Sequence, residues 1–90
     1  MLQLAQVRTR TETVRALKSL NDPRALDTLL MWLPAEPYIP VRAALAELCG
    51  GLAKTPADRD RTRTALQALR DGEKEPSVRS AAEAALAQLR

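Results

Sequence analysis

The feature that most constrains the fold is a sequence that repeats itself after 37 residues. Two segments that begin with proline, residues 40–48 and 76–86, align when their Val-Arg pairs are matched, and their valines stand at positions 41 and 78. A fainter third copy begins at Val14-Arg15 or, alternatively, at Val7-Arg8. Repeats of this length are typical of helical hairpins that stack and bury their apolar faces against one another.

Proline placement and apolar spacing divide the chain into five predicted helices. Leu and Ala dominate the apolar residues, and Phe is absent, so strands are not expected. Proline is tolerated in the first turn of a helix, and four of the six prolines stand just before an apolar helical pattern. The predicted helices cover residues 3–20, 23–33, 39–54, 56–71 and 76–89. The polar, Thr-rich middle of the first helix is a predicted site of kinking or fraying.

Capping residues and short loops support this division. Asp22 and Thr55 stand at N-cap positions, and Thr55 forms a loose capping box with Asp58. Gly72 stands where a left-handed residue would end the fourth helix. Short loops predict antiparallel hairpins. Gly50-Gly51, late in the third helix, is interpreted as a contact point or a weak spot rather than a hinge.

The repeats resemble the HEAT-like repeats of the phycobilisome-linker lyase type. Those repeats read roughly Asp-Pro-x-x-Val-Arg-x-Ala-Ala-x-Ala-Leu, followed by Asp-Pro-Arg-Ala-Leu, and the match covers residues 14–33, 36–52 and 75–89. The resemblance implies an all-α protein, an α-α superhelix of about five helices in two and a half repeats, as a single domain over residues 1–90. The family includes adaptors, regulators and enzyme-associated modules, so the resemblance implies an architecture and not a function.

The side-chain inventory argues against catalysis. The chain has no His and one Cys, which leaves no imidazole or thiolate cage for a metal and no usual base for a nucleophile. We therefore expect no enzyme activity, no cofactor and no metal. The one cysteine, Cys49, is predicted to be a small buried residue in a reducing compartment, so a cytoplasmic location is expected. No apolar run reaches the length of a membrane span, and no signal peptide is recognised.

Two aromatic residues flank the turn between the second and third helices. Trp32 and Tyr38 are the only aromatic side chains in the sequence. Aromatic residues on a turn can anchor a partner protein. Alternatively, Trp32 closes one end of a small core and Tyr38 covers the turn.

Arginines at the repeat valines form a second candidate set. Arg42 and Arg79 each follow a repeat valine. They either grip acidic groups of a partner or form a ladder with acidic residues of the turns, such as Glu36 or Glu75. Their recurrence with the repeat favours the ladder.

A third candidate set is the arginine row of the fourth helix. Arg59, Arg63 and Arg70 fall on one helical face, and such a row can follow a phosphate backbone. Asp58 and Asp60 each precede an arginine by three positions, a spacing that favours a solvated helix held by ion pairs. The formal net charge of +3 permits contact with nucleic acid without requiring it.

These observations favour a non-catalytic protein–protein interaction module, a scaffold or adaptor whose partner is another protein and not a membrane. The binding surface is expected on the third and fifth helices or at the turn between Trp32 and Tyr38. Alanines around the last helix predict an open end that allows self-association. The alternatives are nucleic-acid binding through the fourth helix and an accessory or regulatory domain of an enzyme.

Overall fold

The chain folds into five α-helices joined by short loops. A computed structural model describes residues 7–89, and this range contains no β-strand. The all-α class and the five helices predicted from the sequence are thereby confirmed, whereas the predicted start of the first helix at residue 3 lies outside the described residues. The helices are α1 (Val7–Leu20), α2 (Leu26–Trp32), α3 (Ile39–Leu52), α4 (Pro56–Gly72) and α5 (Pro76–Gln88), with 3-10 turns η2 (Pro23–Ala25) and η3 (Leu33–Ala35) on either side of α2.

The helix starts follow the local chemistry predicted from the sequence. Proline occupies the first turn of α3, α4 and α5, where its missing N–H leaves no helical hydrogen bond unmade. The Asp22 carboxylate accepts from the backbone N–H of Arg24 at 3.0 Å. The hydroxyl of Thr55 accepts from the backbone N–H of Asp58 at 3.1 Å, as a capping box requires.

Two local predictions in the helices differ from the structure. α1 continues through its Thr-rich middle without a break, so the helix is not frayed there. Gly72 is not left-handed, since α4 runs through it and no glycine of the described chain has a positive φ. The left-handed residue is Asn21, with a φ of 50°, which ends α1; Asn is the residue after Gly that tolerates this conformation best.

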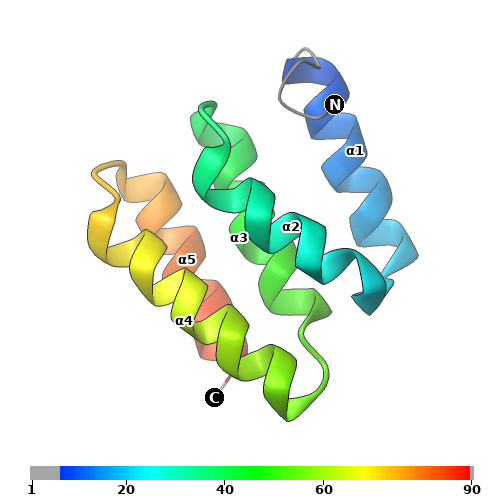
Figure 1. The fold of residues 1–90 in the computed structure, drawn as a ribbon. Coiled ribbons are helices and arrows are strands. Elements are labelled where there is room, and N and C mark those ends of the chain that lie inside the picture. The colour runs from blue at the N-terminus through cyan, green and yellow to red at the C-terminus, as the bar shows by residue number, and fades with distance from the viewer. Residues whose placement is uncertain (1–6, 90) are drawn as a thin grey trace.

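The helices lie in two layers. In Figure 1, α2 and α4 lie in front of α3 and α5, and α1 lies beside α2 and α3. Helices α1, α3 and α5 run in one direction, and α2 and α4 run in the other. α3 contacts all four of the other α-helices, whereas α5 contacts α3 and α4. The loops that lead into α3 and α5 therefore meet at one end of the molecule.

The apolar core lies between α2, α3, α4 and α5. Each buried Leu of this core contributes about 1.5–3 kcal/mol relative to an exposed one. Over residues 8–20, α1 adds Val14 as a buried apolar side chain of this core and Leu17 as a partly buried one. These described side chains of α1 cover less of the core than those of α2 and α3 do. The largest fully buried apolar side chains are Leu26, Leu29, Leu33, Val41, Leu45, Leu52, Leu66, Val78 and Leu89.

Helices α3 and α5 approach closely at one glycine. A Cβ atom added to Gly50 would lie 2.8 Å from the Cβ of Ala85, whereas a Cβ on Gly51 would meet nothing within 4 Å. The contact point predicted for the Gly50-Gly51 pair is therefore Gly50 alone.

Candidate protein-binding surfaces

The carboxylate of Glu36 holds the turn before α3 together. Oε1 lies 2.8 Å from Nε of Arg10 on α1 and accepts a 2.9 Å hydrogen bond from the indole N–H of Trp32. Oε2 accepts from the backbone N–H of Tyr38 at 2.9 Å. A buried charge is tolerated when it is paired and its remaining lone pairs are hydrogen-bonded, which is the case for Glu36.

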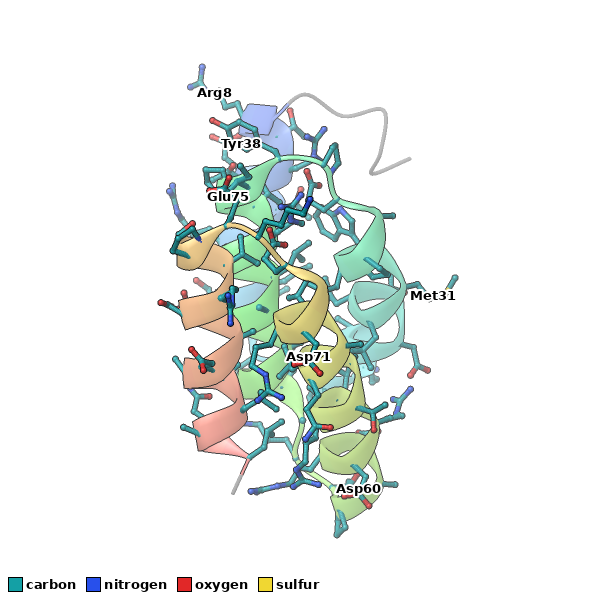
Figure 2. The ribbon with its side chains drawn as sticks, turned by 90° about the vertical axis from the view of Figure 1, so that its left-hand side faces the viewer. Arg8, Met31, Tyr38, Asp60, Asp71 and Glu75 are labelled. Atoms are coloured by element: carbon teal, nitrogen blue, oxygen red, sulfur yellow. The ribbon has the colours of Figure 1, made fainter. Side chains whose placement is uncertain are left out.

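This cluster decides between the two interpretations of the aromatic residues. Trp32 is only 7% exposed, so it belongs to the core and is not presented to a partner. Tyr38 is 44% exposed and remains available for a contact. Figure 2 places Tyr38 at the same end of the molecule as Glu75, where the loops before α3 and α5 meet.

Glu73 holds the loop before α5 in the same way as Glu36 holds the turn before α3. Nη2 of Arg42 lies 2.9 Å from Oε2 of Glu73, and the same oxygen accepts from the backbone N–H of Glu75 at 3.1 Å. Nη1 of Arg42 also donates to the backbone carbonyl oxygens of Glu36 and Pro37, at 3.4 and 3.3 Å. Arg42 thus ties α3 to the loops on both sides of it.

The charge of Glu73 is stabilised by these contacts. Burial raises the pKa of the Glu73 carboxyl, but the backbone N–H of Glu75 and the guanidinium of Arg42 outweigh it, so the pKa lies below its ordinary value of 4.5. The folded protein therefore favours the ionised carboxylate.

Glu36 and Glu73 form a ladder with the register of the repeat. They stand 37 residues apart, as do Val41 and Val78, and each binds an arginine of the preceding helix in the row α1, α3, α5. The ladder predicted for Arg42 and Arg79 is present only at Arg42, which pairs with an acidic residue of a turn, but with the carboxylate of Glu73 and not with that of Glu36 or Glu75. Glu75, which the sequence suggested beside Glu36, stands two positions out of the repeat register, because the residue 37 positions after Glu36 is Glu73. The sequence reasoning also missed Arg10, which the 37-residue spacing does not reveal.

Arg79 is separated from the other candidates. It is exposed, and its side chain makes no ion pair with any residue of the range 7–89. The structure therefore does not pair it with Glu75, as the predicted ladder had required.

The arginine row of α4 is largely neutralised by neighbouring groups. Nη1 of Arg63 lies 2.7 Å from the carboxylate of Asp60, and its Nη2 donates to the carbonyl oxygen of Leu89 at 2.9 Å. Nε of Arg70 lies 3.1 Å from Asp71. These contacts reduce the local positive charge that a phosphate backbone would meet.

The ion pairs predicted within α4 are present. Arg61 binds Asp58 at 2.9 Å, three positions earlier, and also Asp27 of α2. Arg59 is half-buried and lines a hollow of about 380 Å³ beside Lys54 and Arg63, near the start of α4. This end of the molecule is distinct from the end at which the loop glutamates lie.

An apolar groove lies between α2 and α4. Its volume is about 320 Å³, and it continues at one end into a more polar hollow of about 470 Å³. Two small residues of α4, Ala65 and Ala68, face α2 and leave room between the helices. The groove is lined by Leu30, Leu33, Pro34, Ala65, Ala68, Leu69, Gly72 and Glu73. The polar hollow adds Pro37, Ile39, Arg42, Lys74 and Glu75.

The face predicted to bind, on the third and fifth helices, carries a smaller and more polar hollow. Its volume is about 290 Å³, and the side chains of Lys18, Glu47 and Gln88 contribute to its lining. The sequence reasoning did not find the groove between α2 and α4, because the distance between these two helices depends on how both pack on α3.

Chemistry-bearing groups outside these surfaces are few. Cys49 is fully buried, as predicted, and burial raises the pKa of its thiol to about 12, which keeps it protonated at neutral pH. Among residues 7–89, no group of three or more His, Cys, Asp or Glu side chains is placed to hold a metal ion. None of the helices described combines the length and apolarity needed to cross a membrane.

Comparison with known proteins gives no relative. No family model, no curated protein and no solved structure matches the chain. The resemblance to HEAT-like repeats therefore rests on the sequence pattern.

Proposed function

We propose that this chain is a non-catalytic protein–protein interaction module built of HEAT-like repeats, arranged as an α-α superhelix. The repeated loop glutamates support this architecture, because each ties one helix of the row α1, α3, α5 to the loop that leads into the next. The binding surface that we propose is the groove between α2 and α4, and its ligand is an apolar segment of another protein.

The lining of the groove carries this proposal. Leu30 and Leu33 form one wall, and Leu69 with Ala68 forms the other. Small-molecule sites combine apolar walls with several converging polar groups, whereas this groove offers Glu73 alone as a polar side chain, and Arg42 already binds it. A groove of this kind suits aliphatic or aromatic anchor residues of a protein.

The polar hollow beside the groove indicates which residues flank the apolar anchor residues in the bound protein segment. Its rim carries Arg42, Lys74, Glu73 and Glu75, so it offers both signs of charge. The exposed ring of Tyr38 lies at the same end of the molecule. We expect a segment with apolar residues in the groove and polar residues over this rim.

The paired arginines of α4 give weaker support to nucleic-acid binding. Arg63 and Arg70 each lie beside a carboxylate of the same helix, which cancels part of their charge. Nucleic-acid binding is therefore the alternative that nuclease treatment is designed to detect.

The test is affinity capture from a cell lysate with three baits, with and without nuclease. The baits are the unchanged chain, A68E in the groove wall, and Q67E as the matched control at the adjacent exposed position of the same helix. We expect a nuclease-resistant protein on the unchanged chain and on Q67E, and its loss on A68E. Loss of all bound material after nuclease treatment, or equal capture by A68E, would overturn the proposal.

A further inference from the structure

Arg79 occupies the same place in α5 as Arg42 does in α3. Each is the fourth residue of its helix and follows the repeat valine. The backbone N–H of each donates to the carbonyl oxygen four residues earlier, on Tyr38 and Glu75, and both hydrogen bonds are 3.0 Å long. The two arginines therefore leave equivalent helix starts.

The equivalent arginines have unlike surroundings. Arg10 on α1 binds Glu36, and Arg42 on α3 binds Glu73, so each earlier arginine of the row holds a glutamate on the loop that leads to the next helix. Arg79 on α5 is exposed and has no carboxylate partner in the described chain. Among residues 7–89, Arg79 therefore has the position of a ladder arginine, but no carboxylate lies opposite it.

The side chains on the face of α5 that points away from α3 define the surface that a partner would contact. Ser80 and Ala87 on this face are small and exposed, and Ala87 matches Gly50 of α3, a point at which α3 and α5 approach closely. Glu83 is exposed, whereas its counterpart in α3, Ala46, is fully buried. Figure 2 looks onto this side of the molecule, with α4 and α5 toward the viewer.

We propose that this end, defined by Arg79, Ser80, Glu83 and Ala87, binds a helical hairpin of a partner protein. A carboxylate on the loop of that hairpin pairs with Arg79, and a cationic side chain on its helix faces Glu83. The site is separate from the groove between α2 and α4 and adds a second binding face to the proposed function. The two ladder glutamates of a second copy, Glu36 and Glu73, are not available to Arg79, because Arg10 and Arg42 of the same molecule hold them.

The test uses an extended chain, in which a second copy of residues 54–90 is joined directly after Arg90. The loop of this copy carries a second Glu73, and the join keeps the 37-residue spacing of the repeat. If the α5 end accepts this unit, the extended chain unfolds in one thermal transition with a midpoint about 4–8 °C or more above that of the 90-residue chain. In the extended chain R79A lowers the midpoint by about 4–8 °C, whereas in the 90-residue chain the shift stays below about 2 °C.

Two further variants complete the test. The appended unit places no cationic side chain opposite Glu83. E83A removes this uncompensated charge, so it should raise the thermal midpoint of the extended chain and leave that of the 90-residue chain unchanged. R15A, at an exposed arginine of α1, affects both chains equally. Two separate transitions, an unchanged midpoint, or an equal effect of R79A on both chains would overturn the proposal.

Discussion

Nε of Arg10 lies 2.8 Å from Oε1 of Glu36, and both side chains are almost fully buried. This ion pair joins α1 to the turn before α3, across a contact in which Val14 of α1 is buried. Removal of one partner from a buried pair leaves an uncompensated charge. The attachment of α1 therefore depends on both members of this pair being present.

Replacement of Arg10 is expected to destabilise the protein strongly. R10M keeps an apolar stem but leaves the Glu36 carboxylate buried without its cation, at a cost of about 3–5 kcal/mol in the free energy of unfolding. Urea unfolding followed by Trp32 fluorescence measures the loss. R8M is the matched control, because the Arg8 side chain is 89% exposed, and it should change the stability very little. Equal effects of the two substitutions would contradict the role of the buried pair.

The pair between Arg42 and Glu73 predicts a dependence on pH. Because the pKa of Glu73 is lowered from 4.5, the ionised carboxylate stabilises the fold above pH 4.5, and this stabilisation is lost as the pH falls through the lower pKa of the folded state. E73Q should reduce the free energy of unfolding by about 1.5–3 kcal/mol at pH 7 and by much less at pH 3. E83Q, at an exposed glutamate, serves as the control. A stability loss for E73Q that is the same at both pH values would exclude this interpretation.

The two adjacent glycines of α3 should respond to alanine in opposite directions. G51A meets nothing within 4 Å and gains helix propensity, so it should stabilise the protein by about 1 kcal/mol. G50A places its Cβ 2.8 Å from the Cβ of Ala85, and overpacking of this kind costs about 1–3 kcal/mol. Thermal unfolding of both variants tests the close approach of α3 and α5. A higher midpoint for G50A than for the unchanged protein would disprove this close approach.

The thiol of Cys49 should be unreactive in the folded protein. It is fully buried, and its pKa of about 12 leaves almost no thiolate at pH 8. Ellman's reagent should therefore react only as fast as the protein opens, and at full speed in denaturant. Rapid labelling of the native protein at pH 8 would show that the environment of Cys49 is more open than the structure has it.

The helices could be predicted from the sequence because their signals are local. Proline in the first turn and the Thr55 cap act within a few residues, and the repeat fixes the order of the helices. The end of α4 was predicted less well, since Gly72 continues the helix without a left-handed conformation.

The candidate surfaces were predicted only in part, because they depend on contacts between distant residues. Trp32 is buried in a core formed by several helices, and its indole N–H donates to Glu36, which is paired with Arg10 from another helix. The groove between α2 and α4 arises from the packing of both helices on α3. No periodicity within one helix contains that information.

Nuclear magnetic resonance mapping of the bound partner tests the proposed function most directly. The uniformly ¹⁵N-labelled chain is titrated with the protein recovered by the unchanged bait, and changes in the amide signals are placed on the structure. We predict that the changes cluster at Leu30, Leu33, Ala68, Leu69 and Gly72, around the groove between α2 and α4. Changes confined to Arg59, Arg63 and their neighbours at the other end of α4, with the groove unaffected, would contradict the account.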